Sequence, residues 1–108
     1  MNPKEFFPSV YTGTRKSGKT TQLLLRANTT GIPILAHKDI MKNYLERAAK
    51  RMGMHNVKVI TRRDLERNKV EKVIVDEAQF MLEQFIGTKI DSLSVTSYDI
   101  VQLEELQE

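Results

Sequence analysis

Short apolar runs rich in β-branched residues alternate along this chain with longer amphipathic stretches, and turn residues separate the two. The apolar runs predict five strands, at residues 8–12, 32–36, 57–61, 72–76 and 93–97. Helical spacing between them predicts helices at residues 18–28, 39–52, 62–69 and 77–86. Strands that alternate with helices are typical of successive βαβ units. We therefore expect an α/β fold, a three-layer sandwich around a mostly parallel five-stranded sheet.

The same spacing predicts which helix positions are buried. The apolar residues expected to face the core are Leu23, Leu24 and Leu25 in the first helix, Met41, Tyr44, Leu45, Ala48 and Met52 in the second, and Met81, Leu82, Phe85 and Ile86 in the last. Beyond the last predicted strand, Asp99 is placed to cap an acidic helical tail.

Length and composition limit the class of protein. The chain has 108 residues, enough for one core, so we expect a single domain over residues 1–108 and no large two-domain enzyme. It has no cysteine, which excludes disulfides, a cysteine zinc site and a thiol nucleophile. No apolar stretch approaches the roughly 20 residues that span a bilayer. These features predict a cytoplasmic protein with no membrane partner.

Positive charge is concentrated in the first two thirds of the chain. Residues 1–72 hold 16 of the 17 Lys and Arg but only 6 of the 14 Asp and Glu. This imbalance favours a phosphate-binding surface in that part. A solvated face of basic helices would explain the charge alone equally well.

A glycine-rich segment between the first predicted strand and helix carries the clearest chemistry. Residues 13–20 fit G-x-x-x-x-G-K-[ST] at every fixed position. The glycines let successive backbone N–H groups turn toward phosphate oxygens, and the helix adds its positive end. Lys19 would reach the β- and γ-phosphates, and the Thr20 hydroxyl would bind the Mg²⁺ that bridges them. The residues predicted to contact the nucleotide here are Gly13, Thr14, Arg15, Lys16, Ser17, Gly18, Lys19, Thr20 and Thr21. Arg15 is also a candidate arginine finger, although solvent exposure is the alternative for Arg15 and Lys16.

The fourth predicted strand ends in two carboxylates. Its apolar run, Val73 to Val75, leads directly into Asp76 and Glu77. A buried strand delivers such groups to the carboxyl edge of a parallel sheet, the same edge as the glycine-rich loop. Asp76 is predicted to hold Mg²⁺, and Glu77 to polarise the attacking water as catalytic base. A helix start that merely favours acidic residues is the alternative.

Two further polar residues are candidates near the γ-phosphate. Gln79 follows the carboxylate pair and could contact the nucleotide or couple it to nucleic acid, but a helix-surface glutamine is equally expected. Ser97 ends the fifth predicted strand, which we expect to lie between the two motif strands, and could sense the γ-phosphate. Serine is also an ordinary turn residue at a strand end.

Together these motifs resemble the core of P-loop NTPases of the additional-strand, catalytic-glutamate class, over roughly residues 8 to 98. The loop from Thr14 to Thr20 is similar to that of phage terminase large subunits, and Asp76-Glu77-Ala78-Gln79 to the acidic box of helicase-like ATPases. The resemblance implies an ATP-hydrolysing enzyme that uses ATP and Mg²⁺ to move or remodel DNA. Terminases add a nuclease domain and helicases a second RecA-like domain, so this chain would work within a larger assembly, in the host cytoplasm if it is viral.

Two alternatives remain open. The runs Ser17 to Leu24 and Asp76 to Phe80 are also similar to motifs of type II thymidine kinases, although those enzymes carry a cysteine zinc site that this chain lacks. A non-catalytic nucleotide-binding module is the second alternative, against which Glu77 argues.

The resemblance also implies partners. In this class the stabilising arginine commonly comes from a neighbouring subunit, so we expect a homo-oligomer or a partner protein, with Arg62 or Arg63 as candidates to reach across. An ordinary salt bridge is the alternative for either one. Nucleic-acid binding is expected to be sequence-independent and salt-sensitive.

Overall fold

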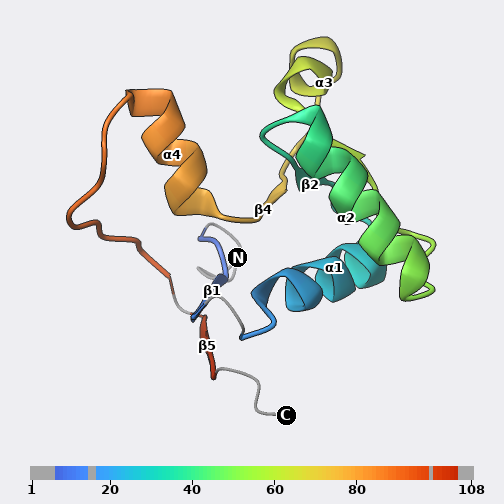
Figure 1. Cartoon of the computed structure of the whole chain (residues 1–108), viewed down its shortest axis with the longest axis horizontal. Helices are drawn as coiled ribbons and strands as arrows, with labels where there is room; N and C mark the ends of the chain where they lie inside the picture. The colour runs from blue at the N-terminus through green and yellow to red at the C-terminus, as the bar shows by residue number, and fades with distance from the viewer. Residues whose placement is uncertain (1–6, 15–16, 98, 105–108) are drawn as a thin grey trace.

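The computed structural model describes residues 7–14, 17–97 and 99–104 (Figure 1). Its elements in chain order are β1 (Val10–Gly13), α1 (Lys19–Thr30), β2 (Ile34–Leu35), α2 (Asp39–Arg51), β3 (Val59–Ile60), α3 (Arg62–Arg67), β4 (Ile74–Val75), α4 (Ala78–Ile86) and β5 (Ile100–Leu103). Every strand pair formed within these ranges is parallel. The α/β class with parallel strands is therefore confirmed.

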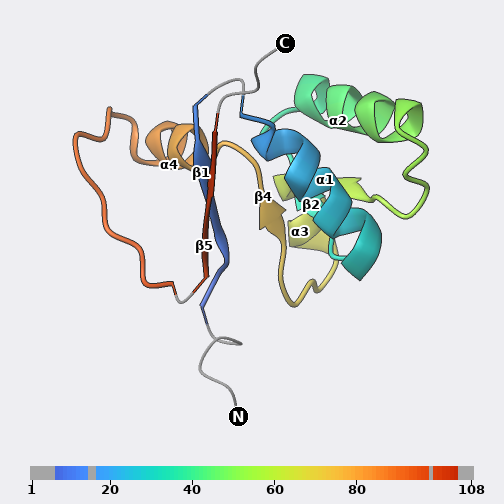
Figure 2. The same cartoon turned by 90° about the horizontal axis from the view of Figure 1, so that it is seen from below.

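The strands form two small sheets and not the single five-stranded sheet that we expected. β2 lies between β3 and β4 in one sheet, and β1 pairs with β5 in the other. Figures 1 and 2 show α4 on the opposite side of the β1–β5 pair from α1, α2 and α3, with β4 between that pair and β2. Within the described ranges, the sheet is divided between β1 and β4.

The segment after α4 explains this division. Residues 93–97, expected as a strand between the two motif strands, have no regular structure. Leu93 and Val95 are exposed, and the segment runs along the outside of the molecule (Figure 2). A central strand pairs with a strand on each side, and residues 93–97 pair with no described strand.

The last described residues also differ from the prediction. Instead of a helix capped by Asp99, residues 100–103 form β5, in register with β1 from Val10 opposite Ile100 to Gly13 opposite Leu103. Exposed and half-buried residues alternate along β5, which is the period of a strand. Residues 105–108 of the predicted tail lie outside the described ranges.

The core lies between α1, α2 and the three-stranded sheet. Its largest fully buried side chains are Leu24 of α1, Ile34 of β2 and Leu45 of α2. Small residues of α1 and α2, including Ala27 and Ala48, let both helices pack closely against the strands. Met41 and Tyr44 of α2, Met52 directly after it and Leu25 of α1 were expected to face the core, but they lie off this face and are exposed.

α4 does not bury the face that its apolar spacing predicts. Leu82, Phe85 and Ile86 are all exposed, and the buried residue of this helix is Glu83. Because the two sheets are separate, no continuous sheet face lies under α4. The prediction for this helix was therefore wrong about its inward face, although its boundaries are close to those expected.

α3 begins with a capping box. The Asp64 carboxylate accepts from the backbone N–H of Thr61 (2.9 Å), and the Thr61 side chain accepts from the first helical turn in return. That N–H lowers the pKa of Asp64 more than any other contact does. The cap fixes the start of α3, where Arg62 and Arg63 are exposed. None of the described helices is both long and apolar enough to cross a membrane.

Candidate functional site

The glycine-rich loop leads from the carboxyl end of β1 into α1, as the sequence predicts. Gly13 has no space for a side chain, because a Cβ there would lie 2.7 Å from the Leu103 carbonyl oxygen and within contact of the Ser17 side chain. Ser17 is buried, and its hydroxyl donates to the Thr14 carbonyl (2.7 Å) to close the turn. Gly18 adopts a left-handed conformation (φ 85°) directly before α1. Both motif glycines are therefore required by the backbone.

Lys19 is the first residue of α1, and its side chain reaches back over the loop. Its Nζ donates to the carbonyl oxygens of Gly13 (2.8 Å) and Thr14 (2.5 Å). The ammonium group thus lies over the start of the loop, where the first N–H groups of α1 also carry partial positive charge. This is a local excess of positive charge built from one side chain and one helix end.

A direct hydrogen bond joins the two sequence motifs. The Thr20 hydroxyl donates to Asp76 Oδ2 (2.9 Å), although the two residues are 56 positions apart. Thr20 lies in the first turn of α1, and Asp76 directly follows β4. The loop and the acidic strand end therefore share one edge of the molecule, as the topology of parallel strands predicts.

This pair fits the oxygen chemistry of Mg²⁺. A hydroxyl that donates its proton to a carboxylate keeps its lone pairs free to bind a cation, and Thr20 and Asp76 are both only partly buried. The described residues contain no group of three or more His, Cys, Asp and Glu side chains that could hold a metal alone. Mg²⁺ bound with a nucleotide does not need such a group, because it keeps waters and takes phosphate oxygens.

Glu77 has an unusual backbone. It adopts φ 55° and ψ 52° and is the only non-glycine residue with a positive φ in the ranges that the structure describes. This turn directs the chain from β4 into α4, whose Met81 N–H donates to the Glu77 carbonyl (3.1 Å). The Glu77 side chain is exposed beside Asp76, so it is accessible to a substrate. Backbone strain of this kind is concentrated at functional sites.

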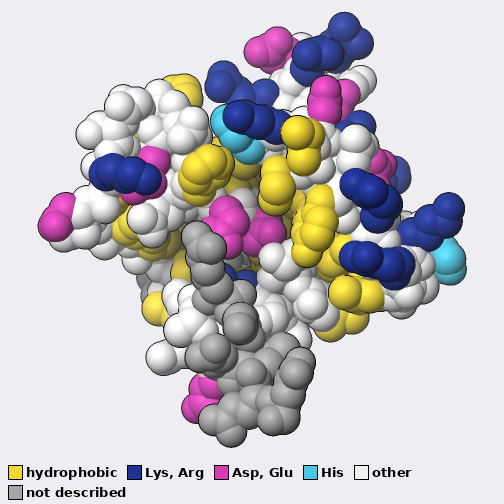
Figure 3. All heavy atoms as spheres, in the orientation of Figure 1, with side chains coloured by type: hydrophobic (Ala, Val, Ile, Leu, Met, Phe, Trp, Pro, Cys, Tyr) yellow, Lys and Arg dark blue, Asp and Glu magenta, His cyan; other side chains and the backbone are white. Residues whose placement is uncertain are grey.

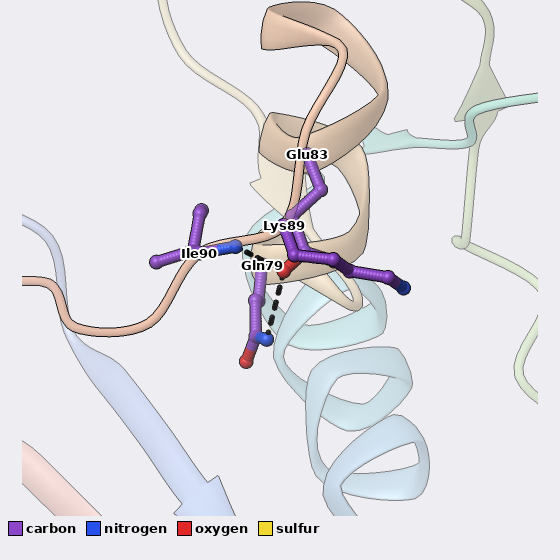
Figure 4. A network of polar contacts seen from close by, with 4 residues as sticks. All are labelled: Gln79, Glu83, Lys89 and Ile90. Atoms are coloured by element: carbon purple, nitrogen blue, oxygen red, sulfur yellow. Dashed lines mark hydrogen bonds and ion pairs between the residues drawn. The ribbon is translucent and has the colours of Figure 1, made fainter.

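Gln79 belongs to a different network, shown in Figure 4. Its side-chain amide donates to Glu83 Oε2 (3.2 Å), which also accepts from the Ile90 backbone N–H (2.8 Å). The Ile90 bond, the Gln79 bond and the nearby Lys89 together lower the pKa of Glu83, the first of them most strongly. The structure thus gives Gln79 a contact within α4.

Ser97 lies away from the loop. Its hydroxyl donates to the Pro8 carbonyl (2.7 Å), beyond the amino end of β1, whereas the loop follows the carboxyl end of β1. The predicted sensor position is therefore not in the site, because residues 93–97 do not form the strand that would deliver it there.

Of the other residues predicted to contact the nucleotide, Thr14 is exposed and Thr21 is half-buried. Arg15 and Lys16 lie outside the described residues.

The structure also contains two hollows that the sequence did not predict, one beside the carboxylate pair and one at the starts of α2 and α3. One is an apolar cavity of about 100 Å³, next to Asp76 and Glu77, whose lining includes Leu35, Met41 and Phe80. The other is a polar hollow of about 580 Å³ at the starts of α2 and α3, with Lys38, Arg62 and Arg63 in its lining. His37 lines both of them. The sequence could have identified His37 by its position directly after the buried run of β2, because residues there reach the functional edge of a parallel sheet.

Comparisons with models of known protein families, with curated proteins and with solved structures gave no match to this chain. Its function is therefore inferred from the chemistry of the site.

Proposed function

We propose that the chain binds a nucleoside triphosphate with Mg²⁺ and hydrolyses its terminal phosphoanhydride bond, with ATP as the expected substrate. The observation that carries the proposal is the hydrogen bond from Thr20 to Asp76 (2.9 Å), because it brings the glycine-rich loop and the acidic strand end to one place. Neither motif would support hydrolysis alone, since one offers phosphate contacts and the other metal and base chemistry.

In this proposal the loop holds the phosphates. Lys19 exchanges its two carbonyl acceptors for charged phosphate oxygens, which are stronger partners for an ammonium group. The N–H groups that begin α1 add to the same positive region. Thr20 and Asp76 would hold Mg²⁺, which neutralises charge on the phosphate oxygens when bound.

Glu77 is proposed as the general base. Its carboxylate is exposed next to Asp76, so it can accept a proton from a water held near the terminal phosphate. The left-handed backbone fixes where the side chain leaves the chain, which favours a positioned base over a mobile surface carboxylate.

The finer fold and the biological role are part of the same proposal. We propose that the two parallel sheets, joined through Thr20 and Asp76, constitute a small P-loop core of the catalytic-glutamate class. Its ATP hydrolysis would serve nucleic-acid handling within a larger assembly, as the resemblance of its motifs to those of DNA motors implies. Arg62 and Arg63 are exposed at the start of α3, as trans-acting arginines would need to be.

The test is phosphate release from each of the four common NTPs, with and without DNA, beside a thymidine-phosphorylation assay. Lys19→Ala is expected to abolish nucleotide binding, since it removes the charge over the loop. Glu77→Gln is expected to retain nucleotide binding while hydrolysis falls at least about a hundredfold, the usual effect of losing a general base.

Lys50→Ala, an exposed lysine in the last turn of α2, is the matched control and should leave both properties unchanged. Undiminished hydrolysis in Glu77→Gln would show that the base lies elsewhere. Phosphorylation of thymidine without NTP hydrolysis would replace the ATPase proposal by a kinase.

A further inference from the structure

The apolar cavity beside Asp76 and Glu77 has a mainly apolar lining that suits part of one planar ring. Leu35 and Leu45 are buried in its wall, and Met41 and Phe80 are exposed in its lining. Its volume of about 100 Å³ is smaller than the roughly 150 Å³ apolar cavity that accommodates benzene, but its exposed residues let a larger ring extend outward. A phosphate would lose its hydration there and would meet the carboxylates of Asp76 and Glu77. The cavity therefore suits an uncharged ring.

An aromatic pair forms one side of this cavity. The rings of His37 and Phe80 meet edge to face, with centroids 5.8 Å apart and planes at 86°. Phe80 is 47% exposed, so part of its ring remains accessible to a ligand. Aromatic side chains of this kind stack on nucleobases without regard to sequence.

The polar hollow continues from the same His37 and has the groups that the rest of a nucleotide requires. Lys38, Arg62 and Arg63 can bind a phosphate, while the carboxylates of Asp39 and Glu66 can accept from sugar hydroxyls. Arg62 also lies over the Phe85 ring of α4, 5.9 Å from its centroid. Figure 3 shows basic side chains gathered at the end of the molecule that carries α3, next to apolar side chains at the centre of this face.

We propose that the cavity and the hollow together bind one nucleotide unit that is separate from the nucleotide on the loop. Its base would occupy the apolar cavity against Phe80 and His37, and its sugar and phosphate would lie in the polar hollow. The inference rests on the proposed function, since it assigns a second ligand to the same edge of the molecule. The unit belongs either to a single strand of nucleic acid or to a free nucleoside monophosphate, which share this chemistry.

The experiment measures binding of a labelled oligo-dT strand by fluorescence anisotropy at low salt and without NTP. An abasic strand of the same length and free dTMP are the comparison probes. The abasic strand is expected to bind on the order of tenfold more weakly than oligo-dT, because it cannot stack on Phe80. Phe80→Ala should remove that difference, and Phe80→Tyr, which keeps the ring, should restore it.

The hollow is tested by charge reversal. Arg63→Glu should weaken oligo-dT binding on the order of tenfold and reduce the salt dependence, because a phosphate contact is lost. Lys50→Glu makes the same type of change on α2 outside the hollow and should have a smaller effect. If dTMP binds with the same dependence on Phe80 and Arg63 and the strand does not, the site is supported with a free nucleotide as its ligand.

Lys19→Ala separates this inference from the proposed function. This variant is expected to lose NTP binding and to keep binding oligo-dT or dTMP, because the second site does not depend on nucleotide binding at the loop. Three results would overturn the inference: no binding of either probe to the unaltered protein, equal affinity for oligo-dT and the abasic strand together with no dTMP binding, or equal effects of Arg63→Glu and Lys50→Glu.

Discussion

At the scale of single residues, Glu77 combines strain with proposed chemistry. A left-handed backbone costs a residue with a side chain about 1–2 kcal/mol, and Glu77 lies in that region with φ 55°. The neighbouring Asp76 is held by Thr20, so the chain must turn sharply between a fixed carboxylate and the start of α4. Glycine or asparagine would relieve the strain, which indicates that a carboxylate at position 77 serves a purpose other than stability.

A pair of variants separates the two effects. Glu77→Asn and Glu77→Gln both remove the carboxylate, but asparagine tolerates the left-handed conformation better than glutamine does. We expect both to lose hydrolysis and the asparagine variant to be more stable than the glutamine variant by about 0.5–1 kcal/mol in urea denaturation. Retained hydrolysis in the asparagine variant, or a more stable glutamine variant, would contradict the role proposed for this residue.

At the scale of elements, α4 is held at its end by Glu83 and not by an apolar face. The Glu83 carboxylate accepts from the Ile90 N–H (2.8 Å) and from Gln79 (3.2 Å), and lies 3.8 Å from Lys89. Gly87, with φ 82°, ends the helix and lets the chain turn back toward this carboxylate. The network fixes the turn after α4 while the apolar side chains of the helix remain exposed.

The lowered pKa of Glu83 predicts a pH dependence of stability. A carboxyl whose pKa is lower in the folded chain than its ordinary value of 4.5 stabilises the fold above that value, and the contribution is lost as the pH falls through the folded pKa. Glu83→Gln should therefore lower the free energy of unfolding at neutral pH and make its decline below about pH 4.5 shallower. Denaturant unfolding between pH 3 and pH 7 measures this, and Glu46→Gln on the exposed side of α2 is the control. Parallel pH curves for Glu83→Gln and the unaltered protein would refute the prediction.

The same elements show how far the sequence reaches. Periodicity located the four helices to within a few residues, because a helical spacing of apolar residues is a local property. It did not predict that α4 would bury Glu83, because the partner N–H of Ile90 comes from a turn seven residues away. Nor did it predict β5, since the short run at 100–103 pairs with β1 through contacts that are distant in sequence.

At the scale of the whole molecule, one well-packed half and one open half meet at the site. α1 and α2 bury Leu24, Ile34 and Leu45 against the three-stranded sheet, whereas β1 and β5 form a two-stranded sheet of their own. Within the described ranges, the hydrogen bond from Thr20 to Asp76 joins α1, which follows β1 of the two-stranded sheet, to the end of β4 at the edge of the three-stranded sheet. The sequence could predict this meeting point, because both motifs follow parallel strands. It could not predict the division of the sheet, which depends on residues 93–97 staying outside.

The central claim is that a triphosphate and Mg²⁺ are held between the loop and Asp76. It is tested most directly by calorimetric titration of a nonhydrolysable ATP analogue with Mg²⁺ or with EDTA. The unaltered protein should bind on the order of tenfold more tightly with Mg²⁺, as expected for gaining one charge-assisted contact. Asp76→Asn should lose that gain and keep the Mg²⁺-independent affinity, and Lys19→Ala should show no binding. Equal affinity with Mg²⁺ and with EDTA in the unaltered protein, or undiminished binding in Lys19→Ala, would contradict the claim.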